Sequence, residues 1–391
     1  MGARPTSVSA TVIDRAAALL SSDGSAVRVE RVEPAAEGFS PSLSSYPWLA
    51  RLVLAGWDDG RTVIVKTQRP ADHWRGTDTT LREHAALDLL AELSCPVAPR
   101  LVAIDDELGL VLLEDLGRGP AVEDILVGSD RGAAVRAVLG HARALATMQA
   151  ATAGQVERFY GRVGHGLTSA DDRVCVQVMP FRRRWERLRA AVAATGLPAV
   201  DECAPDAVAM FDWLDQAGSL LALTNGDFMP QNSRVASSGV RLLDFEGAGF
   251  QHLLLDAVHL RVPFAAAPCW SRLPRDVADL AERTYRSALL PAFPSMADDR
   301  NYQTGVAMAT AAWGVVRLTR LPDVQESGHR LEPTGWTERG QLLQLMVTAA
   351  ESAAASKVLP RFRGWLEAAV ATLERRWSTA GGGEPYYPAF R

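Results

Sequence analysis

The sequence predicts an α+β fold of two lobes, an N-terminal lobe built on an antiparallel sheet and a mainly helical C-terminal lobe. The chain has 391 residues, which is enough for two sizeable hydrophobic cores. Short runs rich in β-branched residues lie before residue 117, whereas helix-like patterns bounded by Pro or Gly fill most of the remainder. We therefore expect the lobes to span 1–117 and 118–391, with the boundary near Gly117–Pro120.

The first lobe is expected to contain a hairpin, a helix and a further strand. A strand-like stretch at 48–55 and the alternating run Arg61–Lys66 flank a turn at Asp58–Gly60. Residues 77–93 have apolar side chains at the spacing of an amphipathic helix. The apolar run at 109–117 is typical of a buried strand that breaks at a glycine.

The second lobe is expected to be a continuous succession of helices, with no low-complexity linker between them. The expected helices span 130–153, 180–194, 206–217, 253–264, 274–290, 302–318, 337–355 and 360–377. Most of them have Pro or Gly at an end, as helix boundaries often do. The pattern predicts one helical lobe.

Composition argues against several classes of partner. A formal net charge of −5 gives no reason to expect nucleic-acid binding. The four cysteines include no CxxC pair, which is typical of reduced thiols in a cytosol and not of disulfides or a zinc site. No apolar run reaches about 18 residues, and no charged-then-apolar leader opens the chain. We expect a cytoplasmic protein without a membrane partner.

The most informative segment lies at 220–246. An apolar run ends just before Asp227, and Asn232 follows that Asp by five residues. After a turn, a second apolar run closes on Asp244 and Glu246. We expect two short strands to bring these side chains to the same end of one small sheet. Phosphoryl transfer needs such a set, because a carboxylate must orient and deprotonate the attacking hydroxyl while hard oxygen ligands hold Mg²⁺.

The spacing Gly-Asp-x-x-x-x-Asn at 226–232, followed by Asp-Phe-Glu at 244–246, resembles the catalytic and metal-binding motifs of the protein kinase-like fold. Within that fold it is similar to the aminoglycoside phosphotransferase and choline kinase branch, because protein kinases carry Asp-Phe-Gly. The resemblance implies that Asp227 is the catalytic base. It also implies that Asn232 and Asp244 hold Mg²⁺, with assistance from Glu246.

Two further positions are interpreted through the same resemblance. The family usually has His where Asn225 stands, and Asn offers one acceptor and two donors with which to keep the loop's shape. Asp256 matches a structural Asp that commonly follows the metal motif. We expect it to support the catalytic loop.

Lys66 is singled out by the rarity of lysine, since Lys66 and Lys357 are the only lysines of the chain. Lys66 closes an alternating strand and resembles the lysine that clamps nucleotide phosphates. The resemblance implies an ion pair with Glu83 on the following helix. Two other interpretations stay open: a solvated lysine at a strand end, and a capping box between Thr80 and Glu83.

The nucleotide base and phosphates would meet two more segments. Backbone groups of Glu114, Asp115 and Leu116 are expected to hydrogen-bond the adenine edge at the junction of the lobes. No GxGxxG loop is present, and the segment 37–45, with Gly38 and Ser40, stands where the phosphate-covering loop should lie. An ordinary strand end and a plain Ser/Pro loop are the alternatives.

The resemblance implies a small-molecule kinase that transfers the γ-phosphoryl group of ATP or GTP, with Mg²⁺, to a hydroxyl of an antibiotic or metabolite. An antibiotic O-phosphotransferase of this kind would be a resistance enzyme. Alternatives are a kinase for an amino sugar, a choline-like amine or a nucleoside, and a nucleotide-binding pseudokinase. A protein kinase is disfavoured because no Ala-Pro-Glu follows the metal motif.

Overall fold

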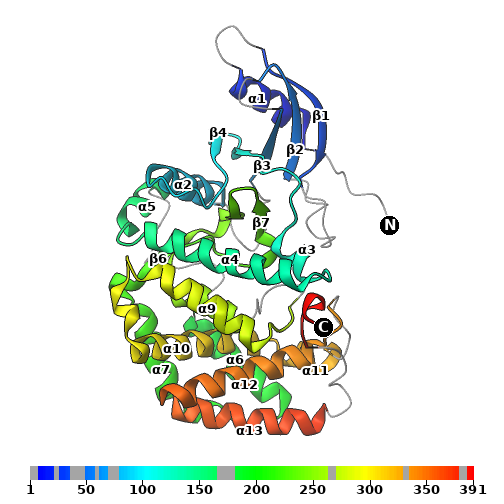
Figure 1. Ribbon diagram of the computed structural model, residues 1–391. Coiled ribbons are helices and arrows are strands. Elements are labelled where there is room, and N and C mark those ends of the chain that lie inside the picture. The colour runs from blue at the N-terminus through cyan, green and yellow to red at the C-terminus, as the bar shows by residue number, and fades with distance from the viewer. Residues whose placement is uncertain are drawn as a thin grey trace.

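The protein has two lobes, a sheet lobe at one end and a larger helical lobe at the other (Figure 1). The computed structural model describes residues 8–21, 26–35, 49–57, 61–68, 79–164, 181–262, 270–328, 334–377 and 385–391. The expected α+β, two-lobed architecture is confirmed.

The sheet lobe is built on five antiparallel strands in the order β1-β2-β3-β5-β4. Their bounds are β1 Arg28–Pro34, β2 Leu49–Ala55, β3 Thr62–Thr67, β4 Leu101–Asp105 and β5 Leu110–Glu114. Strands β2, β3 and β5 fall where the sequence predicts them. Strand β4 was not predicted, because its short run is flanked by polar residues that favour a turn.

The two faces of this sheet have different environments because side chains alternate along each strand. One face, with Leu52, Val63 and Leu112, packs with residues of helix α1 (Ala10–Leu20) in a small core of its own. On the other face Val111 and Leu113 belong to the main hydrophobic cluster of the helical lobe. Side chains on this second face therefore point toward the junction of the lobes.

The helices follow the predicted succession in most places. The predicted helices at 77–93 and through the second lobe correspond to α2 Thr79–Glu92, α4 Arg131–Ala151, α6 Phe181–Thr195, α7 Ala204–Asp215, α9 Arg275–Leu289, α10 Asp299–Leu318, α12 Glu338–Ser356 and α13 Pro360–Arg376. The helices that the sequence did not predict are α1, α3 Val122–Leu126, α5 Val156–Val163 and α11 Leu321–Ser327. All but α1 span eight residues or fewer, too short to give a clear helical period.

The predicted helix at 253–264 is wrong in its length. Only Leu254–Ala257 is α-helical, and a 3₁₀ turn at Val258–Leu260 follows it within the described residues. The segment is almost wholly buried, including Asp256 and His259, so its sequence shows no clear amphipathic period from which to locate the end.

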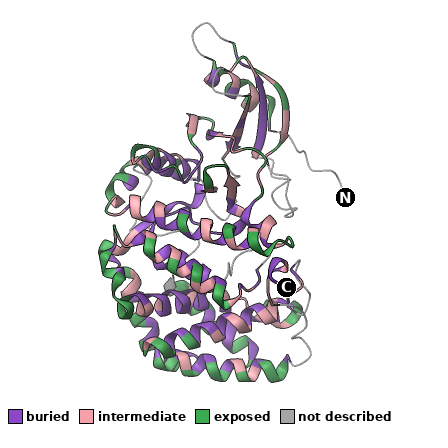
Figure 2. Ribbon diagram, viewed as in Figure 1, coloured by how far each residue is buried: buried purple, intermediate pink, exposed green. Residues whose placement is uncertain are grey.

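The core of the helical lobe lies between long antiparallel helices. Helix α4 packs on α9, α10 packs on α12, and α12 packs on α13. Figure 2 shows buried residues along the inner faces of these helices and exposed residues along their outer faces. Among the described helices, none combines the length and the apolar character that crossing a bilayer requires.

Four short strands lie in or next to the segment 226–246, which resembles a kinase motif: β6 Leu221–Thr224, β7 Ser233–Ala236, β8 Gly239–Leu242 and β9 Gly249–His252. The expectation that both apolar runs of the motif share one sheet is wrong. Strand β6 pairs with β9, whereas β7 pairs with β8 in a separate two-stranded sheet. The partner of β6 is a strand of four buried residues without polar alternation, which the sequence pattern could not distinguish from a helix.

Candidate active site

Lys66 lies at the junction of the lobes with three carboxylates around it. Its Nζ is 2.8 Å from Oε2 of Glu83, 2.6 Å from Oδ1 of Asp244 and 3.7 Å from Oε2 of Glu246. The Lys66 side chain is 8% exposed and that of Glu83 is 2% exposed. The lysine is therefore buried and ion-paired, so it is not a solvated residue at a strand end.

The fold explains why these groups meet. Lys66 follows Ile64 by two positions in β3, so both side chains point to the face of the sheet that meets the helical lobe. Helix α2 carries Glu83, whose Oε1 also accepts a 3.3 Å hydrogen bond from the N–H of Phe245. Thr80 already lies inside α2, and the Glu83 carboxylate contacts Lys66 and Phe245 instead of a helix end. These contacts argue against the capping-box interpretation.

Burial and charge act in opposite directions on the cluster. Burial disfavours the Lys66 ammonium, but Asp244, Glu83 and Glu246 outweigh it and raise the pKa of Lys66. Burial raises the pKa of the Glu83 carboxyl, which Lys66 only partly offsets. Three carboxylates thus surround one ammonium, an excess of negative charge that a metal ion could neutralise.

The loop that carries Asp227 is held through its backbone by Asn225. The Asn225 side chain accepts a 3.2 Å hydrogen bond from the N–H of Asp227. It also donates to the carbonyl oxygens of Leu243, at 2.8 Å, and of Asp227, at 3.4 Å. The Asn225 carboxamide therefore links the loop after β6 to the loop after β8, although β6 and β8 belong to separate sheets.

The oxygen donors predicted to hold a metal ion lie next to each other. Asn232 precedes β7 and its carbonyl oxygen accepts a 2.8 Å hydrogen bond from the N–H of Leu243, directly before Asp244. The Asn232 side chain donates to the backbone oxygen of Asp227 at 3.0 Å, which leaves its own amide oxygen as the atom suited to a cation. Asp244 has the left-handed backbone conformation, with φ 62° and ψ 65°.

This donor set fits Mg²⁺. Mg²⁺ usually takes one or two protein oxygens and completes its octahedron with water and substrate phosphates. Asn232 and Asp244 supply a carboxamide and a carboxylate of that kind. Within the part of the chain that the structure describes, no three His, Cys, Asp or Glu side chains are grouped closely enough to hold an ion by themselves.

The two active-site loops also meet at two glycines. Gly226 has φ +79°, a conformation that favours glycine, and a Cβ built there would lie 2.1 Å from the carbonyl oxygen of Gly247. No side chain fits at that distance. The backbone before Asp227 therefore rests directly on the backbone that follows Glu246.

Asp256 supports the same loop from beneath. It accepts hydrogen bonds from Nε2 of Gln251, at 2.8 Å, and from the hydroxyl of Thr224. The Thr224 hydroxyl oxygen in turn accepts a 2.9 Å hydrogen bond from the N–H of Gly226. Burial raises the pKa of Asp256 to about 7, with the charge of Asp227 adding to the increase. No sequence pattern marks Thr224 or Gln251, which act through this network.

Asp256→Asn is expected to change how stability depends on pH. An unfolded Asp titrates near about pH 4, whereas the folded group titrates at about 7. Between these values the unfolded chain binds fewer protons than the folded one, so the free energy of unfolding of the wild type falls as pH rises. Asn keeps an acceptor for Thr224 and does not titrate. Denaturant midpoints across this range should therefore increasingly favour the variant, and parallel curves would contradict the assignment.

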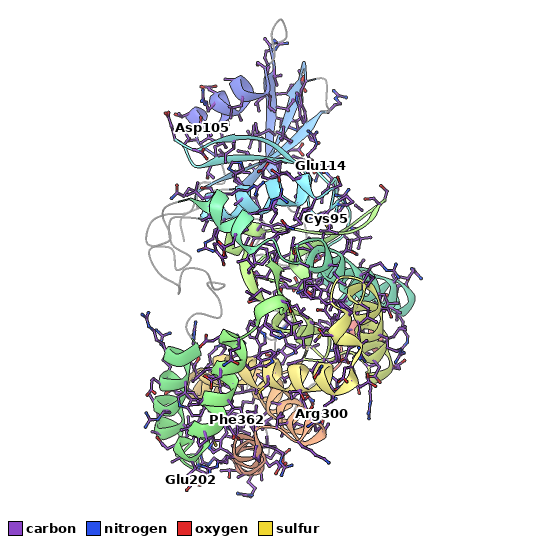
Figure 3. All side chains as sticks on the ribbon, turned by 90° about the vertical axis from the view of Figure 1, so that its left-hand side faces the viewer. Cys95, Asp105, Glu114, Glu202, Arg300 and Phe362 are labelled. Atoms are coloured by element: carbon purple, nitrogen blue, oxygen red, sulfur yellow. The ribbon has the colours of Figure 1, made fainter. Side chains whose placement is uncertain are left out.

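The segment after β5 has one backbone edge available for a ligand. The N–H of Glu114 donates to the Arg100 carbonyl at the start of β4, so the Glu114 carbonyl points to that same edge. If the chain stays extended for two more residues past the end of β5, the Leu116 N–H points to the same edge. Strand β4 does not extend past this point, and Figure 3 places Glu114 where the sheet lobe meets the helical lobe. The Glu114 carboxylate itself accepts the Arg100 N–H at 3.0 Å.

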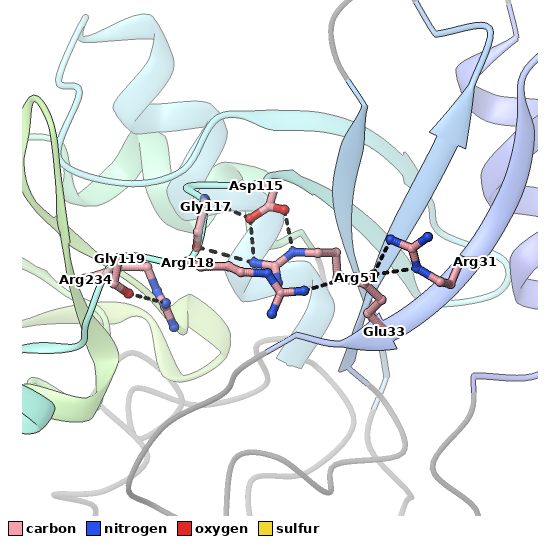
Figure 4. Close-up of polar contacts among 8 residues, drawn as sticks. All are labelled: Arg31, Glu33, Arg51, Asp115, Gly117, Arg118, Gly119 and Arg234. Carbon is pink, nitrogen blue, oxygen red and sulfur yellow. Dashed lines mark hydrogen bonds and ion pairs between the residues drawn. The ribbon is translucent and has the colours of Figure 1, made fainter.

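The side chain of Asp115 has a partner that the sequence analysis missed. Its two oxygens accept hydrogen bonds from Nε and Nη2 of Arg51, at 2.6 and 3.0 Å (Figure 4). The desolvation of Asp115 is outweighed by Arg51, the Gly117 N–H and the Thr62 hydroxyl, which together lower its pKa. Arg51 could have indicated this partner, because it is the one charged residue in the apolar strand β2 and a buried arginine needs a partner.

The proposed phosphate-covering loop, with Gly38 and Ser40, lies outside the described residues, as does the predicted turn at 58–60. Figure 1 shows where the described strands β1 and β2 flank the first of these segments.

A comparison with protein-family models gives one match. Residues 47–298 match the model described as APH, phosphotransferase enzyme family. The matched range includes every described residue of the candidate site, from Lys66 to Asp256. No curated protein matches the chain.

Several solved structures match the chain at low sequence identity. Choline kinase LicA from Streptococcus pneumoniae is 13% identical, with a TM-score of 0.44, and the match covers 88% of this chain and 98% of that one. Macrolide 2'-phosphotransferase MphH from Brachybacterium faecium is 16% identical, with a TM-score of 0.41 and coverage of 79% and 97%. ADP-bound aminoglycoside phosphotransferase APH(2'')-Ib is 12% identical, with a TM-score of 0.43 and coverage of 92% and 99%.

Proposed function

The chain belongs to the APH phosphotransferase enzyme family, and from that membership we propose that it transfers the γ-phosphoryl group of ATP or GTP to a hydroxyl of a small antibiotic or metabolite. The observation that carries the proposal is the buried contact of Lys66 with Glu83 and Asp244. When a nucleotide and its metal ion are bound, Asp244 would contact the metal ion and Lys66 would be available to bind phosphate oxygens.

Each side chain has a proposed part in the transfer. Asp227 orients the acceptor hydroxyl and accepts its proton. Lys66 neutralises charge on the phosphates, and Glu83 keeps its ammonium in place through their 2.8 Å contact. Asn232 and Asp244 would hold Mg²⁺, with Glu246 beside them as a further carboxylate, and the ion would supply positive charge to the transferring group.

Little covalent chemistry is asked of the protein. Because the transition state of phosphoryl transfer is loose, most of the acceleration comes from positioning and from charge neutralisation. The hydrogen bonds of Asn225 and the contact of Gly226 with Gly247 fix the spacing between the proposed base and the proposed metal ligand. The proposed reaction depends on that spacing.

The acceptor class is tested by turnover. Purified protein with MgATP or MgGTP is incubated with hydroxylated antibiotics, amino sugars, choline-like amines and nucleosides, and nucleoside diphosphate release is measured against a no-acceptor control. Turnover with an antibiotic supports a resistance enzyme, whereas turnover with one of the metabolites supports a metabolite kinase. Nucleotide binding without turnover across the panel supports the pseudokinase alternative.

Lys66 is expected to be labelled selectively by an ATP-derived acyl-phosphate probe, and excess MgATP should protect it. The expectation follows if its ammonium lies against the bound phosphates. Lys357 is the matched control, since it is the only other lysine, is exposed at the end of α12 and should be indifferent to nucleotide. Mass spectrometry of one digest can follow both sites. Unchanged Lys66 labelling under saturating MgATP would remove the lysine from the proposed phosphate site.

A further inference from the structure

Arg51 crosses the face of the sheet that points toward the helical lobe. In the register of β2 and β3, Arg51 stands opposite Ile64, and Leu49 stands opposite Lys66. Paired residues point to the same side, so Arg51 and Lys66 share this face. Its guanidinium reaches past β3 to Asp115 and to the carbonyl oxygen of Gly117, at 3.3 Å (Figure 4).

The guanidinium is fixed in one plane. Two parallel hydrogen bonds join it to Asp115, a fork geometry that restrains its rotation. Its side chain is 4% exposed and that of Asp115 is 5% exposed. Asp115 also accepts hydrogen bonds from Gly117 and Thr62, so its acceptor sites are filled. The carboxylate therefore serves to hold Arg51, and a ligand would meet the part of Arg51 that lines a neighbouring cavity.

The guanidinium lies between the proposed phosphate site and the backbone groups that would bind the base edge. Phosphates held by Lys66 would lie beside the cross-strand pair of Lys66 and Leu49. The next pair on this face, Ile64 and Arg51, is about 6–7 Å farther along the strands. The Leu116 N–H and Glu114 carbonyl mark the far end, where a base edge can be hydrogen-bonded. A base between these points would lie over the level of the sheet that carries Ile64 and Arg51.

A cavity adjoins Arg51 and Asp115. It has a volume of about 420 Å³ and is lined mainly by charged residues of β1, β2 and the segment after β5, together with Arg61 and Thr62 at the start of β3. This size is within the range of small-ligand sites. Nearby, Arg31 and Arg118 both form ion pairs with Glu33. The hydrogen bonds that Arg51 donates to Asp115 and Gly117 instead use its N–H groups, which lie in the plane of the guanidinium.

We propose that Arg51 is the platform on which the purine base of the donor nucleotide stacks, held flat by Asp115. An arginine plane stacks on any purine, so the platform tightens binding of both ATP and GTP. This inference rests on the proposed function, because it takes Lys66 as the phosphate site. Arg51 is a positioning and affinity residue and takes no part in the chemical step.

Binding calorimetry can separate the base from the phosphates. The probes are MgATP, MgGTP and magnesium tripolyphosphate, which has the phosphates but no base. Arg51→Met should weaken both nucleotides by about tenfold, while tripolyphosphate affinity stays within twofold of the wild type. Arg51→Lys should resemble Arg51→Met, because an ammonium keeps the charge but has no plane to stack. Arg28→Met, which removes an exposed arginine of β1 that does not line this cavity, is the matched control and should change none of the three affinities.

Other outcomes overturn the inference in distinguishable ways. Equal loss of nucleotide and tripolyphosphate affinity in Arg51→Met, restored in Arg51→Lys, would mean that Arg51 acts by charge alone. Unchanged nucleotide affinity in folded Arg51→Met would mean that its contact with Asp115 is structural. Folding is checked by thermal unfolding, and Arg51→Met with Asp115→Asn provides a variant without an unpaired buried charge. Failure of the wild type to bind any of the three probes would instead overturn the proposed function.

Discussion

Replacing Asp227 by asparagine is expected to lower kcat by at least about a hundredfold, the low end of what a general base contributes. Asn keeps the size of the side chain but cannot accept the proton of the acceptor hydroxyl. The loop itself should keep its shape, since Asn225, Met229 and Asn232 hold residue 227 through its backbone. Steady-state kinetics with an acceptor found by the turnover screen measures the effect.

The Asp227→Asn result has two internal checks. Nucleotide affinity should change little, because Asp227 is proposed to act on the acceptor and not on the donor. Asp212→Asn, on the exposed side of α7, removes one carboxylate from the same lobe and should leave kcat unaltered. Turnover of Asp227→Asn at the wild-type rate would exclude Asp227 as the base.

Lys66→Met is expected to reduce the free energy of unfolding by about 3–5 kcal/mol at neutral pH, the usual cost of removing one partner of a buried ion pair. Met fills a similar volume, so the loss comes from the buried carboxylates left without the ammonium. Protonation of Glu83 relieves this repulsion. Burial already raises the pKa of Glu83, so the deficit should shrink as the pH is lowered from neutral, when denaturant midpoints of variant and wild type are compared.

Lys357→Met provides the matched control for stability, since it removes the only other lysine from an exposed position at the end of α12. Its effect should stay within about 0.5 kcal/mol, as for most surface substitutions. If Lys66→Met were as stable as the control at neutral pH, the ion pairs of Lys66 would contribute little to the free energy of unfolding.

The sequence was a good guide wherever one local pattern determined the structure. The protein kinase-like fold and the family membership followed from the spacing of Asp227, Asn232 and Asp244, which fixes residue types at chemically demanding positions. Long amphipathic helices such as α9 and α10 were located because their period repeats over several turns. The roles assigned to these site residues stay predictions.

Features that depend on distant pairing could not be predicted. The separation of β6 and β8 into two sheets depends on β9, which follows the metal motif and shows no alternation of its own. The contact of Arg51 with Asp115 joins residues 64 positions apart, and no local period reveals it. Thr224 resembles any strand-end threonine until Asp256 is placed beneath it.

The contact of Gly226 with Gly247 has a consequence for how the active site moves. Because the Asn225 side chain bonds both Asp227 and Leu243 while Gly226 packs on Gly247, one loop cannot move away without breaking the contacts of the other. We expect the two loops to open as one cooperative unit in native-state hydrogen exchange, with a common opening free energy for the amides of Gly226 and Ala248. Any fluctuation that moves the loop of Asp227, the proposed base, would then also move the loop of Asp244, the proposed metal ligand.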